Sequence, residues 1–238
     1  MGVFSTRETP MKSKICVGTA VLLFLSVCSA VQGPIAGERV LLPEPRLSGS
    51  VSVETALNRR RSVRDFRNTS ISLRDASQLL WACTGRRIDG ISRASRTYPS
   101  AGGLYPLSVY LVAGKVQSLR EGIYRYIPED HALELLKTGD YRQRLAQAAI
   151  GQVFIAEAPA SIIITALYRK TERVYGKRGK ERYVPMDAGH AAENVYLQAV
   201  SLGMGTVAVG AFIDERVKSI LEVEEAPLYI LPVGWPRK

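Results

Sequence analysis

Three arginines surround one serine between positions 59 and 66 of this 238-residue chain: Arg60, Arg61 and Arg64 flank Ser62. A guanidinium group can bind two phosphate oxygens at once, and a serine hydroxyl can complete the shell around an anion. Each hydrogen bond to a charged group contributes about 1.5–3 kcal/mol, so three such contacts would hold a phosphate firmly. The segment therefore indicates an anion site, and the alternative is a positively charged helix end.

A second candidate is the proline- and glycine-rich stretch from Thr97 to Pro106. Pro99 and Pro106 bracket a run of small residues that includes Gly102 and Gly103. Paired glycines reach backbone torsions that are closed to other residues, and they let a flat ligand approach the main chain closely. A loop that leads into a strand is a common place for function. The stretch predicts a ligand-binding loop, and a plain structural turn is the alternative.

Positive charge is concentrated in a third stretch, from Tyr168 to Tyr183. It contains seven basic and two acidic residues, with tyrosines between them. Basic charge beside aromatic rings suits single-stranded nucleic acid, so a basic nucleic-acid-binding module is one interpretation. We favour a mobile, solvated loop over a ligand site, and we expect no nucleic-acid partner.

The other segments predict the elements that must position these residues. Ser72, with Asp75 three positions later, forms a capping box, and Gly85 ends that helix, which makes Cys83 a packed core thiol. Apolar runs indicate strands, and the isoleucine-rich run 160–167 is typical of a strand buried on both faces. Strands and helices occur without a regular βαβ rhythm, so we predict an α+β fold. Strands are expected at 107–112, 122–127, 132–136, 160–167, 206–212 and 227–233, and helices at 52–59, 72–84, 140–151, 187–202 and after Asp214.

Two of the expected helices carry further information. In the helix 52–59, Val53 and Leu57 are expected on the buried side. In the helix 187–202, Asp187 can cap the start and Gly203 can end it. Small residues on this second helix would let another helix approach closely, so it is either a core helix or a subunit interface. They form one stripe, which comprises Ala188, Ala191, Ala192, Val195, Ala199 and Leu202.

The first 30 residues have the layout of a secretory signal. Lys12 and Lys14 precede the apolar run 15–27, and the small residues at 28–30 offer a cleavage point. The run is short for a membrane span, which needs roughly 20 apolar residues. We therefore expect an exported protein, periplasmic or extracellular. The alternative is an uncleaved anchor, which would attach the protein to a membrane.

Removal of residues 1–30 defines the mature chain. Residues 31–50, rich in proline and glycine, are expected to form a linker or arm, and residues 51–238 the functional domain. The mature balance of 29 basic and 21 acidic residues is +8, which most simply describes a solvated basic face. Cys83 is the one cysteine left, so neither an internal disulfide nor a thiolate metal site is expected.

Taken together, four segments resemble the FMN-dependent nitroreductase superfamily. The form of the proline- and glycine-rich stretch is similar to its SagB-type branch, the thiazole/oxazole dehydrogenase-like enzymes. The resemblance covers about Val51 to Lys238, and it implies an α+β homodimer with a mixed sheet, flanking helices and two FMN sites at the subunit interface. The four segments are Arg60–Arg64, Pro99–Pro106, Asp187–Asn194 and Leu202–Phe212.

The resemblance also implies which residues bind FMN. Those that match the segment holding the phosphate, the ribityl chain and the pyrimidine edge of the flavin are Arg60, Arg61, Ser62 and Arg64. Those that match the loop along the isoalloxazine are Pro99, Ser100, Ala101, Gly102 and Gly103. Those that match the backbone near flavin N5 are Val209, Gly210 and Ala211, and Arg237, with Lys238 beside it, closes on the phosphate.

These assignments imply an FMN-dependent oxidoreductase that exchanges a hydride with a small organic substrate, a nitroaromatic or quinone-like acceptor. The alternatives are a SagB-type azoline-peptide dehydrogenase and a non-catalytic flavin-binding protein. In azole-forming members, a Lys-Tyr pair handles protons, whereas here Val174 precedes Tyr175 and valine transfers no proton. Tyr175 is thus the candidate catalytic side chain, expected to line the substrate pocket of an enzyme that is not an azole synthase.

Overall fold

The computed structural model describes residues 1–3, 37–87 and 95–237. The chain divides into two units, Met1–Gly33 and Pro34–Lys238, and the helices and strands of the described residues belong to the second. From position 4 onward the predicted signal lies outside the described residues, so its cleavage stays a prediction. Within those described ranges, no helix is long and apolar enough to cross a membrane.

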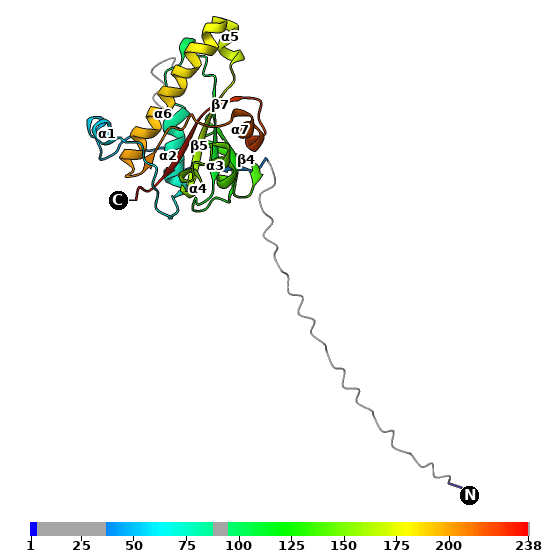
Figure 1. The fold of residues 1–238 in the computed structure, drawn as a ribbon. Coiled ribbons are helices and arrows are strands. Elements are labelled where there is room, and N and C mark those ends of the chain that lie inside the picture. The colour runs from blue at the N-terminus through cyan, green and yellow to red at the C-terminus, as the bar shows by residue number, and fades with distance from the viewer. Residues whose placement is uncertain (4–36, 88–94, 238) are drawn as a thin grey trace. The chain divides into compact units, whose positions relative to one another are not determined.

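A seven-stranded sheet forms the centre of the second unit (Figure 1). Its strands lie in the order β1-β4-β3-β2-β5-β7-β6, and each neighbouring pair is antiparallel. The α+β class is therefore confirmed. Among the described residues, however, the parallel pairing that a mixed sheet requires is limited to two isolated bridges, Ser62–Thr206 and Ile71–Val116. The strands are β1 Arg39–Leu41, β2 Leu107–Ala113, β3 Gly122–Ile127, β4 Ala132–Thr138, β5 Ala160–Ala166, β6 Gly205–Thr206 and β7 Ala226–Gly234.

Helices cover both faces of the sheet because alternate residues of the central strands point to opposite sides. On β5, which is buried throughout, Ile162 and Ile164 join the core cluster that includes residues of α2 and α6, whereas Ile163 joins the cluster that includes residues of α3 and α7. The predicted strand buried on both faces is confirmed. The helices are α1 Val53–Arg59, α2 Leu73–Thr84, α3 Arg142–Ala148, α4 Phe154–Glu157, α5 Arg169–Tyr175, α6 Val184–Ser201 and α7 Asp214–Leu221, with a 3₁₀ turn η1 at Ala101–Gly103 and a π-helical turn η2 at Gly179–Tyr183.

Helix α2 has the predicted ends. The Ser72 hydroxyl accepts the Asp75 N–H and Gly85 follows the last turn. Cys83 is completely buried, as expected for a core thiol.

Helix α1 contradicts its predicted orientation. Val53 and Leu57 are 65% and 55% exposed, and the buried side chain of this helix is Ala56. The spacing that places Val53 and Leu57 on one face is correct, but that face is turned away from this chain's own core. Two neighbouring apolar side chains on a short helix are thus left uncovered by the described residues.

Helix α6 begins earlier than predicted, at Val184, with Pro185 in its first turn. Asp187 is therefore an internal residue and not the cap, because proline already suits the first helical turn. The five residues of the small stripe from Ala188 to Ala199 are buried in this chain's own core, and α6 packs against α2. The core interpretation of the stripe is correct, so the stripe gives no argument for a subunit interface.

Three predictions, for a loop, a strand and the linker, need correction. The basic stretch 168–183 is not a loop, because it folds as α5 and η2. The strand expected at 206–212 shrinks to Gly205–Thr206 and a single bridge between Val209 and Ile230. Part of the segment 31–50 also enters the sheet, as β1.

Candidate functional site

The predicted site residues fall into two groups, and both contact helix α6. The first group is the stretch 97–106, which we call the glycine loop. The second group is the segment 60–64, which we call the arginine segment. Residues 206–211 and the C-terminal Arg237 lie near it and belong to the same group. The contacts of α6 with each group define the geometry of the site.

Two side chains of α6 fix the glycine loop. The Ser100 hydroxyl donates to the Asp187 carboxylate at 2.5 Å and accepts the Tyr105 N–H at 3.0 Å. About two turns further along the helix, the Asn194 amide donates to the Thr97 carbonyl at 3.1 Å. A separation of seven residues places Asp187 and Asn194 on the same side of a helix, so α6 holds the loop at both ends.

Asp187 is buried, with only 2% of its surface exposed. Burial raises the pKa of its carboxyl, whereas hydrogen bonds from the Ser100 hydroxyl and the Ala101 N–H act in the opposite direction. A buried carboxylate that lost these donors would be costly, since an unsatisfied charged group carries its full desolvation penalty. The interaction therefore fixes the turn that contains the two glycines.

Within the loop, the backbone adopts conformations that favour glycine. Gly102 and Gly103 have φ angles of +61° and +66°, and both are exposed. The Tyr175 hydroxyl lies 2.5 Å from the position that a Cβ at Gly102 would occupy, whereas at Gly103 nothing lies closer than 3.9 Å. The structure thus brings Tyr175 to the predicted loop and leaves the main chain at Gly103 open to a ligand.

The arginine segment contacts the other side of α6. The Ser62 and Tyr196 hydroxyls are 3.1 Å apart, and the Tyr196 hydroxyl also accepts the Ala208 N–H at 2.8 Å. The Arg60 guanidinium lies over the Tyr196 ring, 5.4 Å from its centroid, and 3.5 Å from a Glu193 carboxylate oxygen. Tyr196 therefore joins two predicted flavin-binding segments that are far apart in the sequence.

Arg237 contacts the two residues that follow Arg64 in the chain. Its backbone N–H donates to the Asp65 carbonyl at 3.0 Å, and its guanidinium donates to the Phe66 carbonyl at 3.2 Å. A cavity of about 210 Å³ opens nearby, and Arg61 lines it. Arg61 and Arg64 are exposed and have no hydrogen bond or ion pair within the described ranges. Lys238 lies outside them.

The predicted segment Val209 to Ala211 is held at both ends and is open at Gly210. Val209 is paired with Ile230, and the Ala211 carbonyl accepts the Gln152 side-chain amide at 3.0 Å. Gly210 is exposed, and a Cβ there would meet nothing closer than Tyr229 at 3.9 Å. Its backbone is therefore accessible to a ligand.

The two groups do not meet on one side of α6. From Asp187 to Tyr196 the helix advances nine residues, which corresponds to about 14 Å along its axis and about 180° around it. The buried alanine stripe lies between the two flanks and packs into the core. Within one chain, α6 therefore separates the glycine loop from the arginine segment.

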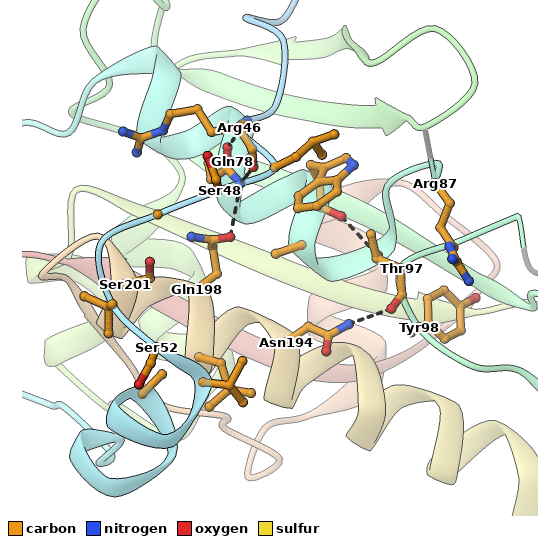
Figure 2. Close-up of a pocket in the computed structure, with 18 of the residues that line it drawn as sticks. Arg46, Ser48, Ser52, Gln78, Arg87, Thr97, Tyr98, Asn194, Gln198 and Ser201 are labelled. Atoms are coloured by element: carbon orange, nitrogen blue, oxygen red, sulfur yellow. Dashed lines mark hydrogen bonds between the residues drawn. The ribbon is translucent and has the colours of Figure 1, made fainter. Parts of the chain in front are cut away.

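A second cavity, with a volume of about 860 Å³, opens in the described part of the chain (Figure 2). It lies between the segment 46–53, α2 and α6, and of the predicted residues only Pro99 lines it. Sequence reasoning did not identify Gln78, which bonds to the backbone of Arg46 and to the Gln198 side chain. Asn194 also lines this cavity, and its place in the segment Asp187–Asn194 was the one feature of the sequence that pointed to it.

Among the described residues, no group of histidine, cysteine, aspartate and glutamate side chains could hold a metal ion. The sequence pattern of the nitroreductase family matches residues 57–235. A Methanocaldococcus jannaschii protein named as a nitroreductase is 46% identical over 184 residues, which cover 77% of this chain and 91% of that protein.

Two further comparisons cover less of the relative. The trifolitoxin operon protein TfxC of Rhizobium leguminosarum is 26% identical over 82% of this chain, which spans 58% of TfxC. A crystal structure from Anabaena variabilis, also named as a nitroreductase, superposes with a TM-score of 0.74 at 26% identity. This chain is covered over 84% of its length but spans only 42% of the Anabaena chain.

Proposed function

Because the chain belongs to the nitroreductase family of flavin-dependent oxidoreductases, we propose that it binds FMN and exchanges a hydride with a small organic acceptor, a quinone or a nitroaromatic compound. The observation that carries the proposal is the Tyr196 hydroxyl. It contacts both the Ser62 hydroxyl and the Ala208 N–H, so two segments with the expected flavin-binding pattern lie side by side.

The phosphate end of FMN fits the arginine segment. Arg61 and Arg64 are exposed cations with no anionic partner among the described residues, and Arg60 has only a long contact to a half-exposed Glu193. Arg237 is anchored beside them by the carbonyls of Asp65 and Phe66. These side chains would bind the phosphate and the pyrimidine edge, where arginine favours the negative charge of a reduced ring.

The ring of the flavin fits the glycine loop. The main chain at Gly103 and Gly210 is open, and a planar ring needs this close approach. When bound, FMN would supply the hydride chemistry, and the protein would orient it. Asp187 and Asn194 hold the loop in place, and Tyr175 covers Gly102 and would line the pocket. The cavity of about 860 Å³ beside Pro99 falls within the usual size of small-molecule sites, about 300–1,000 Å³.

We also propose a homodimer, which the separation of the two groups by α6 supports. One flavin can contact both the glycine loop and the arginine segment only if they come from different subunits. Val53 and Leu57, exposed on α1 next to the arginine segment, would be covered by the partner. Apolar side chains gain about 1.5–3 kcal/mol each on burial, which supports this interface.

Export is the remaining part of the proposal and is supported by the sequence of residues 1–30 alone. Mass measurement of the intact protein from its native host tests it. Loss of the first 30 residues supports cleavage and export, whereas their retention in a membrane fraction supports an anchor.

The test of the function is the absorption spectrum of the purified protein, followed by reduction and reoxidation with a quinone. A bound flavin that is bleached and then reoxidised supports the proposal, and a colourless protein that takes up no FMN contradicts it. Arg60→Ala is expected to weaken FMN binding by about tenfold to a hundredfold, the loss of one charge-assisted contact. Arg120→Ala, at an exposed position in the turn after β2, is the control and should bind FMN normally.

Azoline oxidation is the competing reaction. Val174 is 58% exposed and offers no proton-transfer group beside Tyr175. Azoline oxidation as fast as quinone reduction, and lost in Tyr175→Phe, would make a peptide azoline, which donates a hydride to the flavin, the substrate in place of the proposed acceptor.

A further inference from the structure

The segment 169–183, comprising α5 and η2, is here called the basic arm. It contains seven basic and two acidic residues, a net charge of +5, and this is half of the +10 carried by the whole chain. Figure 1 shows α5 projecting beyond the sheet at the N-terminal end of α6. The basic residues are all exposed: Arg169, Lys170, Arg173, Lys177, Arg178, Lys180 and Arg182.

The basic arm lies against the glycine loop. The Tyr175 hydroxyl is 2.5 Å from the position of a Cβ at Gly102, and the Lys170 ammonium donates to the Tyr105 carbonyl at 3.2 Å. Charge on the arm is therefore placed beside the loop proposed to hold the flavin ring. A solvated basic face with no role at the site would have no reason to lie beside this loop.

The basic arm is a packed structure and not an extended loop. Gly176 has φ +57° and ψ −149°, a region that other residues avoid, and Gly179 packs so closely on Thr171 that a Cβ would lie 2.6 Å from its carbonyl oxygen. The rings of Tyr175 and Tyr183 meet edge to face, 5.0 Å apart. The cations thus project from a packed scaffold.

The charge of the arm is largely uncompensated. Its one ion pair among the described residues, Lys177 with Glu181 at 3.4 Å, is exposed and contributes little. Arg178 and Lys180 contact tyrosines, which leave their charges unneutralised. Arg173 and Arg182 have no partner in the part of the chain that the structure describes.

We propose that the basic arm selects acceptors that carry a negative charge, such as a sulfonate, carboxylate or phosphate on the reducible ring. This inference rests on the proposed flavin chemistry at the glycine loop. A concentrated positive field raises the local concentration and the association rate of anions, and salt screens it over about 8–10 Å. The anionic group would face the arm while the ring lies beside Tyr175.

The experiment compares 1,4-naphthoquinone-2-sulfonate with neutral 1,4-naphthoquinone as acceptors of the FMN-loaded protein, with NADH at one fixed, saturating concentration as the hydride donor in both assays. We expect kcat/KM for the sulfonate to fall about tenfold between roughly 20 and 300 mM NaCl, and kcat/KM for the neutral quinone to stay level. Arg173→Glu/Arg182→Glu should lower the ratio of sulfonate to neutral kcat/KM by at least about tenfold.

Arg120→Glu/Arg144→Glu is the matched control, because it changes the net charge equally. Arg120 follows the end of β2 that is remote from the arm, Arg144 lies on α3, and both are exposed. This variant should keep the ratio. Equal salt dependence for both quinones, or equal effects of the two charge variants, would overturn the inference while leaving the flavin chemistry intact. Failure to reduce either quinone would instead contradict the proposed function. Tight binding of a single-stranded oligonucleotide, lost in the arm variant without a change in the acceptor ratio, would assign the arm to nucleic acid.

Discussion

Gly102 and Gly103 form a natural pair for testing the placement of Tyr175. Both have φ near +60°, so an alanine at either position carries the left-handed cost of about 1–2 kcal/mol. Only at Gly102 does the new Cβ meet an obstacle, the Tyr175 hydroxyl at 2.5 Å. Overpacking costs about 1–3 kcal/mol, so Gly102→Ala should destabilise the protein by about 2–5 kcal/mol and Gly103→Ala by about 1–2 kcal/mol.

Tyr175→Phe should relieve the additional cost. Once the hydroxyl is removed, the nearest atom to the new Cβ is Tyr175 Cζ at 3.4 Å, which is close to ordinary contact. Urea unfolding of the two alanine variants, each with and without Tyr175→Phe, measures the coupling free energy, expected at about 1–3 kcal/mol for Gly102 and near zero for Gly103. Equal destabilisation by the two alanines, or no relief in the Tyr175→Phe background, would refute the contact between the arm and the loop.

Three further predictions concern the glycine loop, His131 in the turn before β4, and the dimer. Ser100→Ala should destabilise the fold by about 1.5–3 kcal/mol in urea unfolding, because it removes one of the two donors to the buried Asp187 carboxylate and leaves only the Ala101 N–H. Asp187→Asn should restore part of this loss in the double variant, since it removes the charge. Burial lowers the pKa of His131 in the folded state, so the unfolded chain takes up the proton first as the pH falls. The stability that neutral His131 contributes is therefore lost as the pH falls below about 6.5. His131→Gln should flatten the pH dependence of stability that thermal unfolding measures between pH 7 and 5. Leu57→Ser should raise the dimer dissociation constant at least about tenfold in analytical ultracentrifugation without unfolding the subunit, and an unchanged dimer would exclude α1 from the interface.

The strands and α2 could be predicted because their signals are local. An isoleucine run is a strand wherever it is buried, and a capping box acts within four residues. The predicted strand at 206–212 failed for a non-local reason: the Ala208 N–H is taken by the Tyr196 hydroxyl and is therefore not available to a sheet neighbour. Twelve residues of sequence separate those partners, and no pattern of apolar residues reports them.

The candidate site likewise contains residues that the sequence could identify and residues that it could not. The arginines and the glycine loop could be identified by residue type, but the role of Asp187 could not. Aspartate near a helix start predicts a cap, whereas Asp187 binds Ser100, 87 residues away in the sequence. The basic stretch was misjudged as a loop because its high charge hides the packing of Gly179 on Thr171 and of Tyr175 on Tyr183.

The position of α6 between the two groups leads to a test of the shared site that does not depend on the substrate. Arg60→Ala damages only the arginine segment, and Gly103→Phe damages only the loop by placing a ring in open space. If each site combines the loop of one subunit with the arginine segment of the other, a mixed dimer of these variants contains one intact site.

Random mixing of equal amounts makes half of the dimers mixed, so about a quarter of the wild-type number of FMN sites should return. The control is a mixture of Arg60→Ala with Arg64→Ala. Both changes lie in the same segment, so every site in a mixed dimer is damaged and no FMN binding should be recovered. If each site instead lay within one chain, the first mixture would also recover nothing, because neither subunit has both halves intact. FMN titration of the two mixtures, after dissociation and reassociation, therefore decides between a site shared across subunits and two separate functions on opposite flanks of α6.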